Sequence, residues 1–367
     1  MTKQTTARLA GLRQKMAENA VDLTVIGPTG HMHWLLGLDP HGDERPVMLF
    51  VSQSYAGLLI PGLNAASVRQ HTDLPFHTWS DDEGPARALA ELIARTGINP
   101  ANVSLSLDES MRADFALRVL DALPGARRSF SETSVSALRC EKDESAYQAL
   151  KASALLNDRA VAAGFAALRE GITEVEIAEV ITAEYEKAGA RAEFTSVCFG
   201  GNGAFCHHHT GTTKLARNSA VLIDAGARHM GYPSDMTRVG WFGDKPSAEF
   251  LKVAGVVESA VQAALAAARP GAPARAVDQA ARGTIAAAGY GDRFLHRTGH
   301  GLGIEIHEEP YITGASDRPL GAGNVFSIEP GVYLEGSFGV RLEDIVFLRP
   351  DGPEVLSEMP RTPIMCG

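Results

Sequence analysis

The chain has 367 residues, which suggests two or three domains at about 150 residues each. Hydrophobic residues make up 45% and charged residues 21%, a balance that excludes a disordered protein. The 34 basic and 44 acidic residues give a formal net charge of −10, which disfavours a surface for nucleic acid or anionic membranes. We therefore expect neither nucleic acid nor membrane as a partner.

The beginning of the sequence and its cysteines indicate a cytoplasmic location. The first residues lack an apolar signal core, and no apolar run approaches the roughly 18 residues of a membrane helix. The 4 cysteines are scattered and form no CxxC pair, so neither a disulfide framework nor a structural zinc site is expected.

The first 135 residues alternate between helical and strand patterns. Leu9, Leu12 and Met16 recur at helical spacing. Short apolar runs predict strands at 21–26, 47–51, 57–60 and 103–107, and the regions 85–96 and 112–123 are expected to be helices. This alternation predicts a small α/β domain over residues 1–135.

A polar stretch at 132–144 marks the expected domain boundary, and residues 140–367 follow a different pattern. Helices are predicted at 145–170, 173–188, 247–268 and 273–288, the second opening with a capping box of Thr173 and Glu176. Strand pairs are predicted at 220–225 with 237–242 and at 325–328 with 339–348. The order of two helices and a strand pair occurs twice, which suggests an internal structural duplication.

Four acidic residues punctuate these strand patterns: Asp224, Asp235, Glu329 and Glu343. A carboxylate buried in an apolar strand is costly unless it is paired or binds a metal, although any one of them could simply accept hydrogen bonds from a loop. Four carboxylates brought together carry a charge that two divalent cations would neutralise. If the four converge, the sequence favours a two-metal site for ions such as Mn²⁺, Co²⁺ or Zn²⁺.

The histidines are distributed unevenly. Three are consecutive at 207–209, and three more are His296, His300 and His307. In a two-metal hydrolase, histidines that are not metal ligands can transfer protons or stabilise a developing oxyanion. His208 and His209 are expected to be ordinary loop residues.

The order and spacing of six segments resemble the pita-bread metallopeptidases, which include aminopeptidase P and prolidase, with creatinase as a metal-free cousin. The segments are LIDAG at 222–226, GYPSDMTR at 231–238, HRTGHGLG at 296–303, HEEP at 307–310, IEPG at 328–331 and VRLED at 340–344. The resemblance covers the C-terminal ~225 residues closely. It implies an α+β fold with a pita-bread catalytic domain at 140–367, preceded by a smaller creatinase-type α/β domain at 1–135.

The resemblance also implies roles for the metal ligands. Asp224 would chelate one of two divalent ions, with manganese expected first and cobalt or zinc as alternatives. Asp235 and Glu343 would bridge both ions, and His300 and Glu329 would complete the shell of the second.

Further roles follow for residues on the substrate side. Glu329 would act as acid and base, His207 would face the substrate, and His307 would contact the scissile carbonyl. His296 would line the pocket for proline, or else simply cap or pack. Arg341 would orient the bridging glutamate or hold a substrate carboxylate, its plain alternative being a structural partner of Asp344 or Glu343.

The implied function is hydrolysis of the Xaa-Pro bond of dipeptides or short peptides by a metal-bridging hydroxide. A dipeptidase and an aminopeptidase both remain open. Alternatives are a same-fold enzyme acting on a small molecule, such as creatine-type or ectoine-type C–N hydrolysis or a sulfonium lyase, and a non-enzymatic binding module. The family also implies a homodimer, in which the charged loop 39–45 of one subunit could close the active site of the other.

Overall fold

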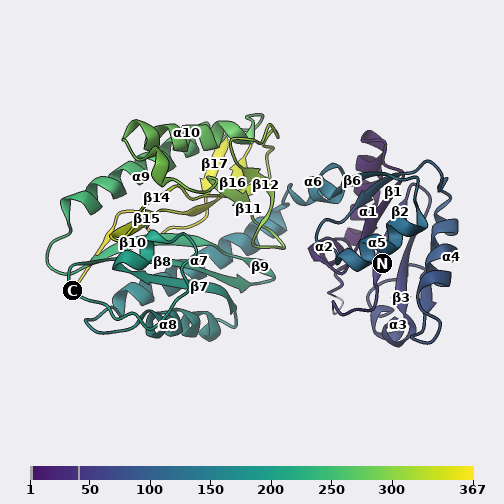
Figure 1. Cartoon of the computed structure of the whole chain (residues 1–367), viewed down its shortest axis with the longest axis horizontal. Coiled ribbons are helices and arrows are strands. Elements are labelled where there is room, and N and C mark those ends of the chain that lie inside the picture. Colours follow the sequence, from purple (N-terminus) through teal and green to yellow (C-terminus); the bar gives the residue numbers. More distant parts are fainter. Residues whose placement is uncertain (1–2, 40–41) are drawn as a thin grey trace. The chain divides into compact units, whose positions relative to one another are not determined.

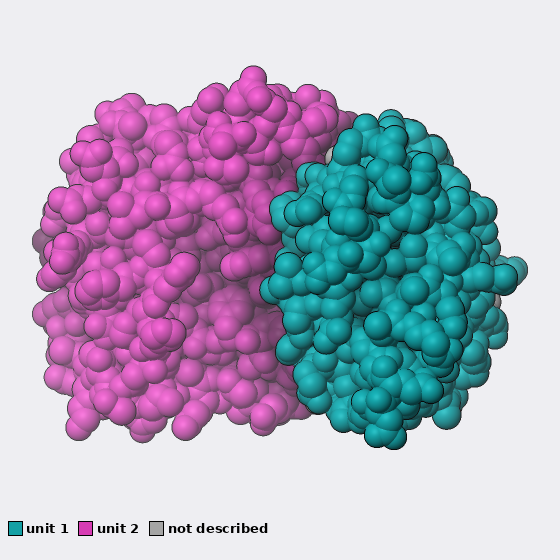
Figure 2. Space-filling view, turned by 45° about the vertical axis from the view of Figure 1, so that its right-hand side comes forward, with its two compact units in different colours: residues 1–139 teal, residues 140–367 magenta. Residues whose placement is uncertain are grey.

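The computed structural model describes residues 3–39 and 42–367, and all element counts below refer to these residues. The chain forms two compact units, Met1–Arg139 and Cys140–Gly367 (Figure 2). Two residues of the predicted loop 39–45, Pro40 and His41, lie outside the described residues.

The first unit is built on a six-stranded mixed sheet with the order β4-β3-β2-β1-β5-β6. The central strand β1 pairs antiparallel with β2 and parallel with β5. Two apolar clusters are buried in this unit, one built around α1, α2 and α6 and the other around α4 and α5 (Figure 1). The elements are α1 (Lys3–Glu18), β1 (Leu23–Ile26), α2 (Gly30–Leu36), β2 (Met48–Ser52), β3 (Ala56–Pro61), α3 (Gly62–Val68), β4 (Phe76–Trp79), α4 (Ala86–Thr96), β5 (Ser104–Leu107), α5 (Ala113–Ala122), β6 (Arg127–Phe130) and α6 (Val135–Arg139).

The strands and helices expected in this unit are present, and five short helices and strands were not anticipated, including the five-residue helix α6 within the expected boundary stretch. Strands β4 and β6 lie at the two edges of the sheet and have four residues each, too few for a clear alternating pattern. Helices α2 and α3 have seven residues each, too few for a periodic pattern. In the charged loop, Arg45 forms two hydrogen bonds of 3.0 Å to the carboxylate of Asp81.

The second unit contains two sheets, each packed against a helix pair. The first half comprises α7 (Glu144–Ala166), α8 (Glu174–Lys187), β7 (Arg191–Phe199), the 3₁₀ helix Gly200–Ala204, β8 (Ser219–His229), β9 (Tyr232–Pro233) and β10 (Met236–Phe242). The second half comprises α9 (Ala248–Ala267), α10 (Ala274–Ala287), β11 (Gly299–Gly301), β12 (Glu308–Ile312), β13 (Val325–Ile328), β14 (Gly331–Leu334), β15 (Phe338–Arg341), β16 (Asp344–Arg349), β17 (Gly352–Val355) and β18 (Ile364–Cys366).

The sheets of this unit have the orders β18-β10-β8-β7 and β12-β11-β13-β16-β17, with β14 and β15 as a separate ribbon. One apolar cluster joins α7 and α8 to β7 and β8, and another joins α9 and α10 to the strands of the second half. In Figure 1 the strands lie between α8 below and α9 and α10 above. Two helices and a sheet therefore occur twice, as the sequence pattern suggested.

The helix starts follow local capping chemistry. Thr173 forms the expected capping box with Glu176, and Asp143 and Ser247 accept backbone N–H groups at the starts of α7 and α9. Helix α7 ends at Ala166, before the predicted limit at 170. Ala167 caps the helix, and Gly171, at φ 80°, then turns the chain toward α8 and donates its N–H to the carbonyl of Leu215.

Helix α9 corrects one expectation about apolar segments. Among the described residues it is the one helix long and apolar enough to cross a membrane by composition. A core helix can meet the same criterion, and Phe250, Val257 and Val261 of α9 are fully buried in the cluster shared with α10. Packing inside the second unit accounts for the buried face of the helix, which is 39% of its apolar window.

The predicted strand 339–348 is instead two strands that join different partners. Strand β15 pairs with β14, and β16 pairs with β13. The break falls at Leu342 and Glu343, whose N–H groups bond to the carbonyls of Pro330 and of Thr237 on β10 and not to β14 or β13. Glu343 therefore belongs to neither strand, and the alternation of side chains along β15 and β16 does not determine where its side chain points.

A buried ion pair lies directly behind this break. Arg238 of β10, 1% exposed, donates to the carboxylate of Asp344 at 2.7 Å and to the carbonyl of Glu343 at 2.7 Å. The second oxygen of Asp344 accepts from Arg361 at 2.6 Å. These bonds connect β10 of one sheet to β16 of the other, so they fix the position of Glu343 relative to β10.

We predict that Arg238→Met will lower the free energy of unfolding by about 3–5 kcal/mol, because it leaves the Asp344 carboxylate buried without this partner. Chemical denaturation will measure the loss. The control is Arg217→Met, since the Arg217–Asp244 pair is 41% and 80% exposed and its loss should cost no more than about 1 kcal/mol. Equal losses in the two variants would contradict the prediction.

Candidate metal and active site

A cavity of about 630 Å³ opens in the second unit. It contains most of the residues that the sequence singled out. Its lining consists of Phe194, Cys206, His207, Asp224, Asp235, His296, Arg297, His300, Ile306, His307, Glu329, Arg341 and Glu343.

The four acidic residues reach this cavity from both halves of the unit. Asp224 lies within β8 and Asp235 immediately precedes β10, whereas Glu329 follows β13 and Glu343 lies between β15 and β16. Ligand atoms of Asp235, His300 and Glu343 all lie within 4.8 Å of one another. His300 Nε2 is 3.6 Å from Asp235 and 3.3 Å from Glu329. The structure therefore brings together the candidate ligands that the sequence left separate.

His300 has the protonation state that a metal ligand needs. Its Nδ1 lies 3.1 Å from the carbonyl oxygen of Gly301, which can only accept, so Nδ1 carries the proton. The lone pair of Nε2 then faces the carboxylates. Burial, followed by the neighbouring His307, lowers the pKa of His300 to about 3, so the ring is neutral near pH 7.

Asp224 also has a free coordination position. One of its carboxylate oxygens accepts a hydrogen bond of 2.6 Å from Arg341. The other, Oδ1, is buried and has no hydrogen-bond partner. Because an orphaned buried oxygen is costly, this atom fits a cation ligand.

The electrostatics of the cavity require positive charge. Burial and the charges of Glu343 and Asp224 raise the pKa of Asp235 well above its usual range, and burial with Glu329 and Asp224 does the same for Glu343. Burial raises the pKa of Glu329 to about 7, against the opposing charge of Arg341. A set of oxygen donors with one imidazole suits hard or borderline divalent ions, so these residues fit the implied metals.

Two glycines allow the backbone around His300 to pack closely. A Cβ on Gly299 would lie 1.9 Å from the carbonyl oxygen of Ser327, and one on Gly301 would lie 2.3 Å from that of Glu309. Strand β11 can therefore fit between β12 and β13 only because these side chains are absent.

Arg341 begins a chain of hydrogen bonds along the cavity wall. It donates to Asp224, to Thr237 at 2.9 Å and to the hydroxyl of Tyr333 at 2.9 Å. Thr237 in turn donates to Glu343 at 2.7 Å. Arg341 thus contacts one candidate ligand directly and a second through Thr237.

The chain continues to His296. Its Nδ1 lies 2.7 Å from the carbonyl of Arg297 and must donate, so its Nε2 accepts from Tyr333 at 2.7 Å. Burial and the charge of Arg341 lower the pKa of His296 to about 4, which keeps the ring neutral. Tyr333 carried no signal in the sequence, because an aromatic residue in a strand is ordinary.

The remaining substrate-side histidines lie on loops. The ring centroids of His307 and His300 are 4.0 Å apart, and desolvation and the charge of Arg297 lower the pKa of His307. His207 is exposed on the loop that follows the 3₁₀ helix Gly200–Ala204. Both residues line the cavity.

A fully buried glutamate that the sequence analysis missed holds the His207 loop. Glu174, in the first turn of α8, accepts N–H groups of Phe199 and Asn202 on one oxygen, at 2.9 and 2.8 Å. The other oxygen bonds to His208 at 3.0 Å and to the N–H of Gly211 at 3.1 Å. An acidic residue at a helix start is common, so no signal distinguished it. His208 therefore has a defined structural partner, while His209 is exposed.

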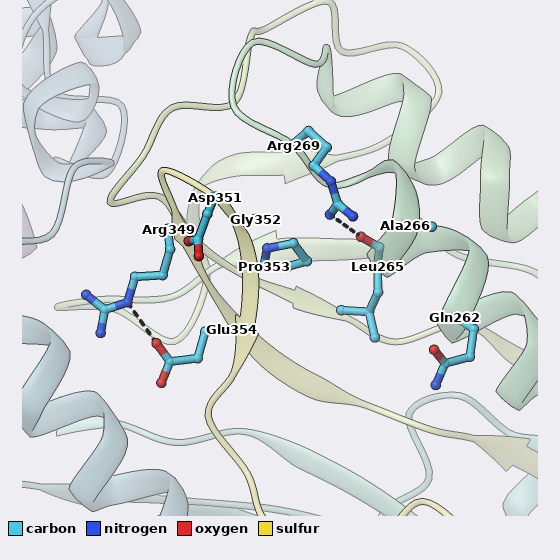
Figure 3. A pocket seen from close by; sticks show the side chains of 9 residues that line it. All are labelled: Gln262, Leu265, Ala266, Arg269, Arg349, Asp351, Gly352, Pro353 and Glu354. Atoms are coloured by element: carbon cyan, nitrogen blue, oxygen red, sulfur yellow. Dashed lines mark hydrogen bonds and ion pairs between the residues drawn. The ribbon is translucent and has the colours of Figure 1, made fainter.

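Two other features do not form comparable sites. A hollow of about 660 Å³ beside α9 and β17 has both of its arginines hydrogen-bonded within the protein: Arg349 bonds to Glu354 and Arg269 to the carbonyl of Leu265 (Figure 3). In the first unit, His31 approaches Asp108 and Glu109. Its Nδ1 accepts from Arg139 at 2.8 Å, so Nε2 carries the proton and lacks a lone pair for a metal.

The fold and this constellation define a metallopeptidase. The chain matches the model of metallopeptidase family M24 over residues 148–350 and that of the creatinase/prolidase N-terminal domain over residues 8–139. It belongs to metallopeptidase family M24. The family and the two-domain fold expected from the motifs are thereby confirmed.

Individual relatives span nearly the whole chain. It is 34% identical to a putative dipeptidase, YkvY, of Bacillus subtilis, covering 90% of this chain and 92% of the relative. It is 32% identical to an Xaa-Pro dipeptidase of Lactobacillus delbrueckii subsp. lactis, covering 93% and 94%. Among solved structures, a prolidase from Thermococcus sibiricus superposes with a TM-score of 0.90 at 32% identity, covering 100% of both chains.

We predict that Glu174→Gln will reduce kcat/KM by displacing the loop that carries His207. In the native protein both carboxylate oxygens of Glu174 accept hydrogen bonds. In the variant the amide nitrogen would face an N–H donor without an acceptor, and such an unsatisfied buried donor costs about 1–3 kcal/mol. Steady-state kinetics and thermal denaturation will measure both effects. Glu179→Gln on the exposed face of the same helix is the matched control, and equal losses in the two variants would remove the assigned role.

We predict that chelation will destabilise the protein more at about pH 8 than at about pH 5.5. In the folded protein the pKa of Glu329 is about 7, above its ordinary value of 4.5. Protonation of Glu329 therefore stabilises the metal-free fold, fully so below pH 4.5. This stabilisation is lost as the pH rises through 7. Melting temperatures with and without chelator will show this. A drop in melting temperature on chelation that is equal at the two pH values, or larger at about pH 5.5, would contradict the prediction.

Proposed function

We propose that this protein is a dinuclear metal-dependent peptidase that hydrolyses the Xaa-Pro bond of dipeptides. The observation that carries the proposal is the convergence of five metal-type side chains, from both halves of the second unit, on one cavity: Asp224, Asp235, His300, Glu329 and Glu343. Relatives named as Xaa-Pro dipeptidase and prolidase support the same substrate.

The proposed cofactor is a pair of divalent ions, manganese first, with cobalt or zinc as alternatives. Asp224 would chelate one ion, Asp235 and Glu343 would bridge both, and His300 with Glu329 would complete the second shell. When bound, the ions would supply Lewis acidity toward the peptide carbonyl and the attacking water.

The chain's own residues would complete the chemistry. His307 would donate a hydrogen bond to the scissile carbonyl oxygen as negative charge develops there. Glu329, poised by burial at a pKa of about 7, would accept a proton from the attacking water and deliver it to the departing nitrogen. That proton matters because the proline nitrogen must leave as a secondary amine.

The other predicted residues would position these groups. His207, on the loop held by Glu174, would face the residue before proline. His296, neutral and fixed by Tyr333, would line the proline side. Arg341, whose hydrogen bonds go to Asp224, Thr237 and Tyr333, would orient metal ligands instead of binding substrate.

The proposal includes a homodimer in the cytoplasm. The homodimer, with loop 39–45 of one subunit closing the site of the other, comes from the family resemblance. The cytoplasmic location is supported by free thiols at all 4 cysteines and by the packing of the apolar helix α9 within the core.

We predict that the purified protein will bind two divalent ions per chain and hydrolyse Xaa-Pro dipeptides. Asp235→Asn will abolish metal binding and activity together. The loss will exceed the roughly 10- to 100-fold loss of metal affinity or activity that is typical when a residue that only hydrogen-bonds to a metal ligand is replaced. Elemental analysis and a proline-release assay measure the two properties. Asp292→Asn, an exposed site in the same unit, is the control. Metal binding without peptide cleavage would favour the alternative of a small-molecule enzyme.

A further inference from the structure

The loop that carries His307 is held by the side chain of the residue that follows it. Residues 302–307 join β11 to β12, and Glu308 is the first residue of β12. One oxygen of the Glu308 carboxylate accepts the N–H of Glu305 at 3.1 Å, which closes a turn over this part of the loop. The other oxygen accepts a hydrogen bond of 2.8 Å from the ammonium group of Lys142, 166 residues earlier in the chain. The carboxylate therefore links the loop of His307 to a cation from a distant segment.

The ion pair between Lys142 and Glu308 is buried, with side chains that are 4% and 6% exposed. Gly303 provides the space for it. A Cβ at this position would lie 2.3 Å from a carboxylate oxygen of Glu308 and 2.9 Å from Cε of Lys142. Loss of either partner would leave the other charge desolvated and unbalanced, so a buried pair constrains the segments that it joins far more than a surface pair does.

The backbone of Lys142 is fixed as well. Its N–H donates to the carbonyl of Gly323 at 2.8 Å, and the carbonyl of Cys140 accepts from the side chain of Asn324 at 3.2 Å. A Cβ on Gly323 would lie 3.0 Å from the carbonyl oxygen of Lys142. The segment 140–142 therefore presents the ammonium group from a backbone that is itself hydrogen-bonded to the turn before β13.

A second cation holds the same loop. Arg228 of β8 donates to the carbonyl of Ile304 at 2.8 Å. Arg228 and Lys142 both precede α9 in the chain, whereas the loop belongs to the second half of the unit. The ring of His307 packs against that of His300, with centroids 4.0 Å apart. The position of His307 relative to the candidate metal ligands therefore depends on bonds that cross from one half to the other.

We propose that Lys142 is a positioning residue for the reaction: through Glu308 it holds His307 where the imidazole can donate to the scissile carbonyl oxygen. The inference rests on the proposed Xaa-Pro peptidase function. Lys142 acts on the loop and not on the substrate. Because the hydrogen bond of His307 strengthens as negative charge develops in the transition state, a displaced loop lowers kcat more than it raises KM.

The test is a double-mutant cycle measured on an Xaa-Pro dipeptide with the metal-loaded enzyme. Lys142→Met will lower kcat by about 10- to 100-fold and change KM by less than about threefold. In a His307→Ala background the same substitution will lower kcat by less than about twofold, because the donor that it displaces is already absent. The control is Lys151→Met, since Lys151 also donates to a distant carbonyl, that of Leu356 at 2.8 Å, and its loss will leave kcat unchanged.

A second variant keeps the test decisive if Lys142→Met does not fold. Lys142→Met combined with Glu308→Gln removes both charges of the pair and leaves no unbalanced charge in the interior. This variant will show the same loss of kcat and the same lack of effect in the His307→Ala background. Melting temperature and metal content, measured for every variant, identify losses due to misfolding or to an empty metal site.

The outcomes separate this role from the peptidase function. Multiplying losses from Lys142→Met and His307→Ala would overturn the role of Lys142 and leave the peptidase function standing. A raised KM with unchanged kcat, or wild-type kcat in the variant that lacks both charges, would likewise overturn it. No hydrolysis by the metal-loaded wild-type enzyme would instead overturn the peptidase function, and the role of Lys142 with it.

Discussion

Repulsion among buried carboxylates is the constraint on which the second unit depends. Asp235 and Glu343 are 7% and 2% exposed and share their cavity with two further acids. Such a cluster is tolerable only when cations balance it. Arg341 provides one positive charge from within the chain, and the donor set indicates that the rest comes from metal. The fold accepts an unfavourable arrangement because that arrangement creates affinity for divalent ions.

The surroundings of the cluster are correspondingly rigid. Arg238 and Asp344 tie the two sheets together behind Glu343, and the glycines beside His300 let three strands approach closely. Glu174 holds the loop of His207 in a similar way, with a buried charge surrounded by N–H donors. His296, Asp224 and the loop of His207 are thus positioned by hydrogen bonds to other elements, which is how a site on loops attains a defined geometry.

The sequence predicted the parts of this site that leave a pattern. A carboxylate such as Asp224 inside an apolar run is detectable, and the motif spacing grouped it with Asp235 and His300. Long amphipathic helices and their caps were predictable for the same reason. The break at Glu343 was not predictable, because the residues on both sides favour strands and the interruption comes from hydrogen bonds of Leu342 to Pro330 and of Glu343 to Thr237 of the other sheet. No sequence pattern identified Glu174 or Tyr333, because their roles depend on contacts with segments that are distant in the sequence.

The ligands are divided between the halves of the second unit, and this division has a consequence for folding. Asp224 and Asp235 come from the first half, whereas His300, Glu329 and Glu343 come from the second. The candidate set of ligands is therefore assembled only when the two halves fold against each other. Either half expressed by itself would carry an incomplete set, so the assembly of the cavity reports on the docking of the two halves.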